Sequence, residues 1–216
     1  MSDREKGLFV TLEGGEGAGK SVQAAAICQR LQDSRRSVVV TREPGGTPLG
    51  ERLRAILLDL ADERLKIEPL SETLLFIAAR AELVATVIRP ALSRGDVVIC
   101  DRFADSTRAY QGFGRGIELA RIDALNDAAT LGLTPDLTVL LDLAPAQSLA
   151  RRPAAENDDR FGREGLSFHE RVRAGYLALA EGAPEHWLVI DASQEREAIT
   201  DAICQRIEQL LPERKQ

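Results

Sequence analysis

The stretch GGEGAGKS, residues 14–21, lies between an apolar run, LFVTLE, and a helical pattern, KSVQAAAICQRLQ. Gly14, Gly19, Lys20 and Ser21 satisfy the spacing G-x-x-x-x-G-K-[ST] of a phosphate-binding loop. Glycines let successive N–H groups converge on one anion at a helix N-terminus, whose dipole favours negative charge. A glycine-rich turn with a chance Lys-Ser is the alternative, but it would not require a strand before it and a helix after it.

The loop is therefore predicted to bind a nucleoside triphosphate. Lys20 would neutralise the β- and γ-phosphates, and the Ser21 hydroxyl would bind Mg²⁺. Glu16 is unexpected, because it introduces a carboxylate where negative charge should be least favourable. The predicted backbone cradle consists of Gly14, Gly15, Glu16, Gly17, Ala18 and Gly19.

Short apolar runs rich in β-branched residues recur along the chain, with helical patterns between them. Such continuous runs are typical of strands buried on both faces of a sheet. The alternation predicts an α/β fold of three layers, the P-loop NTPase fold, with a parallel five-stranded sheet flanked by helices. The predicted strands are 8–13, 37–41, 96–100, 137–143 and 187–190, and the predicted helices are 20–34, 49–60, 71–94, 117–131, 167–181 and 194–211.

Composition limits the class of protein. The 216 residues, 44% of them hydrophobic, suit one domain, residues 1–216, with a sizeable core. The three cysteines show neither metal-ligand nor disulfide spacing and are interpreted as buried thiols in a reducing compartment. A net charge of −6 argues against nucleic-acid binding. No apolar run has the length of a signal peptide or membrane span, so we expect a cytoplasmic protein without a membrane partner.

The longest helical pattern, SETLLFIAARAELVATVI, begins at residue 71. Its apolar residues at 3,4 spacing predict that one stripe of the helix is buried. That stripe consists of Leu74, Ala78, Ala81, Ala85 and Ile88.

Residues 150–165, ARRPAAENDDRFGREG, are charged and have no apolar periodicity. We interpret them as an exposed, mobile segment that is longer than most connections in compact domains. Taken alone, the segment is equally compatible with a solvated loop and with a lid over a binding site.

A second acid is needed to hold the metal ion or its water shell. Asp101 ends the apolar run DVVIC, where the carboxyl end of a strand would meet the phosphate loop. Asp142 ends another run, so the assignment is not unique, and Asp101 could instead cap the next helix. Asp101 is preferred because Arg102 and further polar residues follow it directly.

Two other segments predict a pocket for a second ligand. In TREPGGT, residues 41–47, a Pro-Gly-Gly turn follows a strand, and Glu43 is the polar residue just beyond the strand end. Phe76 and Arg80 are i,i+4 partners, so that an aromatic ring and a guanidinium share one side of a helix. Phe76 as plain core and Arg80 as a surface charge is the competing interpretation.

The segment DRFADSTRAYQG, residues 101–112, adds hydroxyl and amide groups. If this segment is helical, Thr107 and Gln111 share one face, and so do Ser106 and Tyr110. Such groups can read the edge of a flat polar molecule.

Together these segments resemble the bacterial thymidylate kinase family, the dTMP kinases of the nucleoside monophosphate kinase group. The resemblance extends over nearly the whole chain in the order and approximate spacing of the family. It runs through FVTLEGGEGAGKS, TREPGGT, LLFIAARAEL, VVICDRFADSTRAYQG, PDLTVLLDL and the DR at 159–160.

The resemblance implies roles for the residues of the acceptor pocket. Phe76 corresponds to the residue that stacks on thymine, and Arg80 to the one that hydrogen-bonds its carbonyl edge. Thr107 and Gln111 correspond to contacts with the pyrimidine, and Tyr110 to the residue under the sugar that lacks a 2′-hydroxyl. The implied activity is phosphorylation of dTMP to dTDP with ATP and Mg²⁺, for dTTP synthesis.

The resemblance also implies a phosphate-transfer apparatus. Arg102 would hold the 5′-phosphate of the acceptor, and Asp101 would lie near Mg²⁺ and that phosphate. A mobile cation that closes over the transferring group would complete the site, so the lid interpretation of 150–165 becomes the preferred one. We select Arg152 and Arg160 as the lid cations, although acidic residues interrupt the arginines here more than in many relatives.

The resemblance also gives Glu16 a role. Its side chain would point away from the donor and accept a hydrogen bond from the 3′-hydroxyl of the acceptor sugar. Some family members carry a basic residue at the position of Gly17 and lack lid arginines. This chain has glycine there, which implies that the lid supplies the cation.

Two rival functions remain at this stage. A kinase for another pyrimidine monophosphate, such as dUMP, would show the same features, whereas a nucleotide-switch GTPase or ATPase is disfavoured because the chain has no N-K-x-D motif. The family forms homodimers, so we expect a homodimer with small-molecule substrates and no nucleic-acid partner.

Overall fold

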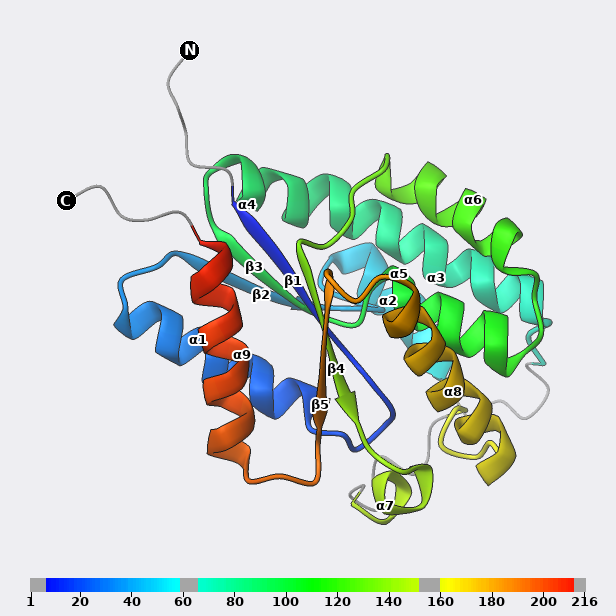
Figure 1. Ribbon diagram of the computed structural model, residues 1–216. Helices are drawn as coiled ribbons and strands as arrows, with labels where there is room; N and C mark the ends of the chain where they lie inside the picture. Colours follow the sequence, from blue (N-terminus) through cyan, green and yellow to red (C-terminus); the bar gives the residue numbers. More distant parts are fainter. Residues whose placement is uncertain (1–6, 59–65, 152–159, 212–216) are drawn as a thin grey trace.

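The computed structural model describes residues 7–58, 66–151 and 160–211 (Figure 1). Its centre is a sheet of five parallel strands in the order β2-β3-β1-β4-β5. The predicted α/β fold is confirmed, and each strand lies within one residue of its predicted bounds. The strands are β1 (Leu8–Glu13), β2 (Val38–Arg42), β3 (Val97–Asp101), β4 (Leu137–Asp142) and β5 (Trp187–Asp191).

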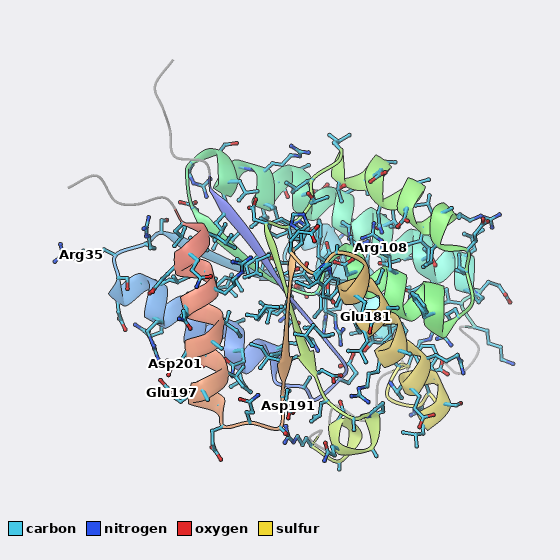
Figure 2. The ribbon with its side chains drawn as sticks, viewed as in Figure 1. Arg35, Arg108, Glu181, Asp191, Glu197 and Asp201 are labelled. Carbon is cyan, nitrogen blue, oxygen red and sulfur yellow. The ribbon has the colours of Figure 1, made fainter. Side chains whose placement is uncertain are left out.

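Helices cover both faces of the sheet (Figure 1). α1 (Lys20–Asp33) and α9 (Arg196–Leu210) lie together on one face, and Figure 2 shows Glu197 and Asp201 on the side of α9 that is turned toward α1. Arg30 of α1 forms ion pairs with both carboxylates. The other helices are α2 (Pro48–Leu58), α3 (Pro69–Leu83), η1 (Val84–Ile88), α4 (Arg89–Ser93), α5 (Ala104–Thr107), η2 (Arg108–Gly114), α6 (Leu119–Thr130), α7 (Pro145–Ala150) and α8 (Leu166–Gly182).

The alternation of side chains along β1 divides the core into two layers. Leu8, Val10 and Leu12 pack in the cluster shared with α1 and α9. Phe9 points to the opposite face, where it meets the η1 and α4 residues and Phe103. Because successive strand residues alternate between faces, Glu13 lies on the same face as Phe9. β1 therefore delivers a carboxylate, and not only the phosphate loop, to the end of the sheet.

The predicted burial on both faces is correct for the three central strands but not for the two edge strands. β1, β3 and β4 are buried along almost their whole length, whereas β2 and β5 are only partly buried. Edge strands have a neighbour on one side only, and Val40 and Val189 are nearly half exposed. A continuous apolar run therefore does not distinguish an edge strand from a central strand.

The predicted buried stripe of α3 is wrong. Leu74 is 45% exposed, and Ala78 and Ala85 are exposed too. Of the five predicted members only Ile88 is buried, and Thr73 and Arg80 lie on the buried side instead. The buried side of this helical segment is mixed: Arg80 lines the cavity, whereas Leu83 and Ile88 pack in the apolar core. Hydrophobic periodicity alone therefore identified the wrong side.

Three helical segments differ from the expectation. α7 was not predicted, and the helix over 71–94 begins at Pro69 and contains the π-helical turn η1. From the sequence, a helix within residues 101–112 was only the condition under which Thr107 and Gln111 would share one face. α5 and η2 form that helix. Half of the predicted lid, residues 152–159, lies outside the described residues, which include 150–151 and 160–165 of it. Within the described residues, no helix is both long and apolar enough to cross a membrane.

Candidate active site

The phosphate loop connects β1 to α1. Gly19 has φ of 94° and immediately precedes Lys20, where α1 begins. Gly14 has φ of 136°, and a Cβ there would lie 2.5 Å from the carbonyl oxygen of Leu141. Both positions therefore require glycine, for backbone conformation and, at Gly14, for its close approach to β4.

Lys20 is folded back onto the loop. Its Nζ donates hydrogen bonds to the carbonyl oxygens of Gly14 at 3.2 Å and Gly15 at 2.8 Å. Burial, and then the positive charge of Arg102, lower the pKa of Lys20, while Asp101 and Glu16 oppose that shift. A second anion at this position, such as a triphosphate, would favour the charged ammonium form.

Ser21 and Asp101 come together at the end of β3. The Ser21 hydroxyl donates to Oδ2 of Asp101 over 2.6 Å. Asp142, the alternative acid, is instead held by Arg173 through two hydrogen bonds of 2.7 and 2.8 Å. A hydroxyl beside a carboxylate with an available oxygen fits Mg²⁺, which keeps several waters and needs few protein ligands. In the described residues no group of three or more His, Cys, Asp or Glu forms a metal cluster, and this chemistry does not require one.

Arg102 occupies the centre of the site in a left-handed backbone conformation, with φ of 70°. Non-glycine residues adopt this region at a cost of the order of 1 kcal/mol or more, and usually at functional positions. Its Nη1 donates to the carbonyl of Gly14 at 3.0 Å, and Nη2 to Glu16 at 2.5 Å. The guanidinium also lies 5.0 Å from the ring centroid of Tyr110. The fork is therefore oriented before any ligand arrives.

Glu16 points toward Arg102 and Tyr110. Its Oε1 accepts from Arg102 and, at 3.3 Å, from the Tyr110 hydroxyl. The expectation that this carboxylate lies on the side of the second pocket agrees with this geometry. Its charge is offset by the guanidinium that follows β3, which explains how an acid is tolerated in a phosphate loop. The contact with a 3′-hydroxyl stays a prediction.

All the residues predicted for the acceptor pocket line one cavity. The cavity unites three segments that are distant in the sequence: the phosphate loop, α3, and the α5–η2 segment. The predicted residues in its lining are Glu16, Glu43, Phe76, Arg80, Arg102, Thr107, Tyr110 and Gln111.

Arg80 is not a surface charge, and other residues already accept hydrogen bonds from its guanidinium. It is 1% exposed and donates from Nε and Nη2 to Oε2 of Glu43, at 2.9 and 2.6 Å. Nη2 also donates to the carbonyl of Phe103, and Nη1 to Asn126. A guanidinium has five N–H donors, and these contacts use four of them. One Nη1–H remains in this set for an acceptor group of a ligand.

Aromatic rings form the opposite wall of the cavity. Phe76 lies 6.0 Å from Phe161, which is also packed edge-on against Tyr110 at 5.5 Å. Phe161 belongs to the segment that was predicted as a lid, so the end of that segment forms part of the cavity. Of the two predicted lid cations, Arg160 donates to Glu72 at 3.4 Å, and Arg152 lies outside the described residues.

Several functional neighbours were missed from the sequence. Ser148 of α7 donates to the carbonyl of Glu16 and ties the helix that precedes the predicted lid to the phosphate loop. Arg54 lines the cavity, and Tyr176 donates to Glu13. No local pattern marks Ser148, Arg54 or Tyr176. Glu13 had a usable signal, because it is a strand-end acid like Asp101.

Glu13 is a buried carboxylate beneath Arg102. It accepts from the backbone N–H of Phe103 at 2.8 Å, from Ser106 at 2.6 Å and from Tyr176 at 2.9 Å. Burial is the main cause that raises its pKa from 4.5 to about 7, and the charge of Asp105 adds to it. The hydrogen bond from Ser106, and the charge of Arg102, oppose the shift.

We expect Glu13 to make folding stability depend on pH. Its folded pKa is above the unfolded value, so the folded chain binds this proton more tightly and its contribution to stability falls as pH rises from about 4.5 to about 7. Glu13→Gln should remove that loss, which is of the order of 3 kcal/mol for a shift of this size. Urea unfolding of the parent and of Glu13→Gln at pH 5 and pH 8 measures this loss of stability. Other groups titrate in both proteins, so their contributions cancel in the comparison. Equal pH profiles would contradict the assignment.

Comparison with known proteins adds an independent observation. Residues 12–203 match the family model described as thymidylate kinase. The chain is 52% identical over 194 residues to a thymidylate kinase of Deinococcus radiodurans, which covers 90% of this chain and 93% of that protein. It is 49% identical over 205 residues to a thymidylate kinase of Pseudomonas fluorescens, which covers 95% and 97%.

A solved structure agrees in fold. The crystal structure of thymidylate kinase from Ehrlichia chaffeensis superposes with a TM-score of 0.75 at 34% sequence identity. The match covers 94% of this chain and 99% of that one. Similarity therefore extends over the whole lengths of these proteins, and the site lies within the matched part of the chain.

Proposed function

The chain belongs to the thymidylate kinase family, and from that premise we infer that it phosphorylates dTMP to dTDP with ATP as the donor. The observation that carries this inference to the level of residues is the shared cavity. Glu16 of the phosphate loop, the buried guanidinium of Arg80 and the rings of Phe76 and Phe161 line the same cavity. This arrangement suits a donor on one side and a planar, phosphorylated acceptor on the other.

For the acceptor, we propose that Phe76 stacks on the thymine ring and that Arg80 donates its remaining Nη1–H to the base carbonyl. Thr107 and Gln111 then face the pyrimidine edge, and Tyr110 lies under the sugar. Arg102 holds the 5′-phosphate in place of one of its present contacts. Glu43 acts through Arg80, because its Oε2 anchors two N–H groups of that guanidinium.

For the donor, we propose that the backbone N–H groups from Gly14 to Gly19 cradle the phosphates of ATP. Lys20 would release the Gly14 and Gly15 carbonyls and bind the β- and γ-phosphates. Ser21 and Asp101 would hold Mg²⁺, which would neutralise negative charge on the donor phosphates. The chain contributes positioning and charge stabilisation rather than a covalent intermediate.

α7, which leads into the predicted lid, contacts the donor side through Ser148, and Phe161 of the lid segment lines the acceptor cavity. We therefore propose that segment 150–165 closes over the transferring phosphoryl group with Arg152 and Arg160 as its cations. Arg160→Ala and Arg152→Ala should each lower kcat about tenfold and change the KM for ATP less, because a cation of this kind acts on charge that develops during transfer. Steady-state kinetics measures both. Normal turnover in both variants would show that the lid assignment is wrong.

Product analysis tests the function itself. Chromatography of a reaction with ATP, Mg²⁺ and dTMP should show dTDP and ADP in equal amounts. ADP without dTDP would instead indicate an ATPase or nucleotide switch. A kinase for dUMP remains the nearest alternative, because uracil and thymine differ by one methyl group, which is worth about 1–3 kcal/mol in a pocket.

We also propose a homodimer formed through α3. Its outward side carries Leu70 and Leu74, 44% and 45% exposed, followed at helical spacing by Ala78 and Ala85. A continuous apolar strip on a helix favours a protein partner. Light scattering should give about twice the chain mass of 23.6 kDa, and a single-chain mass would contradict the proposal. A cytoplasmic location and the absence of a nucleic-acid partner stay predictions from the sequence.

A further inference from the structure

Glu72, in the first turn of α3, is a buried carboxylate close to the base side of the cavity. It is 1% exposed, and it is not among the described residues that line the cavity. Its Oε1 accepts a hydrogen bond of 3.0 Å from Nε2 of Gln111, which does line the cavity. Glu72 is therefore placed to act on a ligand only through another side chain.

The contact determines which end of the Gln111 amide faces Glu72. An ionised carboxylate only accepts hydrogen bonds, so the amide nitrogen must point toward it. The amide oxygen, Oε1 of Gln111, is then on the side away from Glu72. Within the described part of the chain, no group donates a hydrogen bond to this oxygen. A reversed amide would put two acceptor oxygens together in a site where Gln111 is 1% exposed. A buried mismatch of this kind costs about 1–3 kcal/mol.

Two arginines hold Glu72 in position. Arg115 donates to Oε1 and Oε2 at 3.3 and 3.4 Å, and Arg160 donates to Oε2 at 3.4 Å. Arg115 also pairs with Glu164 at 2.5 Å and lies 4.8 Å from the centroid of the Phe168 ring. The carboxylate that orients Gln111 is thus fixed by a network that includes the described end of the lid segment.

The direction of this amide matters for the choice of base. Thymine and uracil present an N3–H donor between their two carbonyls, whereas cytosine presents an N3 acceptor there. A fixed Oε1 can accept from N3–H, but it opposes the lone pair of cytosine N3. A glutamine that is free to rotate would serve both bases.

We infer that Glu72 is a positioning residue for base selectivity, which holds the Gln111 amide so that the pocket accepts thymine and rejects cytosine. The inference rests on the proposed placement of the base against Gln111. It concerns the hydrogen-bonding edge of the base and not the methyl group. It therefore predicts that Glu72 contributes to discrimination between dTMP and dCMP, and not to discrimination between dTMP and dUMP.

The test is the isosteric change Glu72→Gln, which lets both amides rotate. The readout is kcat/KM for dTMP, dCMP and dUMP. We expect the dTMP-to-dCMP ratio to fall about tenfold, a change equivalent to about 1.4 kcal/mol. The dTMP-to-dUMP ratio should stay within about twofold, a change equivalent to about 0.4 kcal/mol. Non-specific loosening of the pocket would move both ratios together, so dUMP is the internal control.

A matched control variant is Glu164→Gln. It removes the other carboxylate on Arg115 and leaves the contact between Glu72 and Gln111 in place. Its dTMP-to-dCMP ratio should remain that of the parent. An equal fall in Glu164→Gln and Glu72→Gln would overturn the inference, as would an unchanged ratio in Glu72→Gln.

If Glu72→Gln does not fold, the exchange of both residues keeps the test available. In the double variant Glu72→Gln with Gln111→Glu, the new amide donates to the new carboxylate, whose second oxygen faces the base. Preference for dTMP over dCMP should be retained, and its loss would contradict the inference. A parent protein without a preference for dTMP would refute the proposed function instead, so the two failures are distinguishable.

Discussion

Replacing Lys20 with methionine should lower kcat about 1,000-fold or more, the scale expected when a preorganised cation is removed from a phosphoryl-transfer site. Lys20 is buried, and its ammonium group has only carbonyl oxygens of the loop as hydrogen-bond partners among the described residues. Neutral carbonyls are weak partners for a buried charge, and burial lowers the pKa of Lys20. A triphosphate is a far better partner, so most of its interaction energy becomes available when the donor binds.

The measurement is kcat at saturating ATP and dTMP, with ATP affinity measured separately by calorimetry. Lys20→Arg is the matched variant, because it retains the charge but changes the reach and geometry of the donors. It should fall between the parent and Lys20→Met. A tenfold loss of kcat corresponds to only about 1.4 kcal/mol. If kcat of Lys20→Met stayed within that range of the parent, a group other than Lys20 would stabilise the charge of the transition state.

The second large effect is expected at Arg102. Arg102→Met should lower kcat/KM for dTMP about 1,000-fold and leave the KM for ATP little changed, because two charge-assisted hydrogen bonds to a phosphate contribute about 1.5–3 kcal/mol each. The left-handed backbone and the contacts with Gly14, Glu16 and Tyr110 hold the fork in advance. Arg102→Lys should recover only part of the loss, since the ammonium lacks the fork geometry.

Arg102→Met also removes the guanidinium that pairs with Glu16, whose carboxylate lies next to the expected position of the acceptor phosphate. Part of the loss should therefore be repulsion by that carboxylate. The double variant Arg102→Met with Glu16→Gln separates the two contributions and should bind dTMP better than Arg102→Met alone. If Arg102→Met affected ATP and dTMP equally, the assignment of Arg102 to the acceptor would be wrong.

The sequence was informative where function depends on chain order. The spacing around Lys20 and the strand-end rule identified the phosphate loop and Asp101, because parallel strands bring their carboxyl ends to one edge of the sheet. The same rule did not separate Asp101 from Asp142. That distinction depends on Arg173 of α8, which binds Asp142 from 31 residues away.

The sequence was misleading or silent where function depends on packing between distant segments. The apolar strip of α3 was interpreted as core, but the buried side of that helix includes Thr73 and Arg80, and Arg80 lines the cavity. Glu72 has no local signature, since its partners are 39, 43 and 88 residues away. Arg80 was identified, but its dependence on Glu43 and Asn126 required the folded chain.

The choice of acceptor is the central claim, and a coupled assay of ADP release tests it most directly. The assay compares kcat/KM for dTMP, dUMP, dCMP, CMP, AMP and GMP with ATP and Mg²⁺ held saturating. The cavity around Phe76, Arg80 and Gln111 predicts the highest kcat/KM for dTMP, with dUMP next and the purine monophosphates far below. A higher kcat/KM for CMP, AMP or GMP than for dTMP would contradict the account.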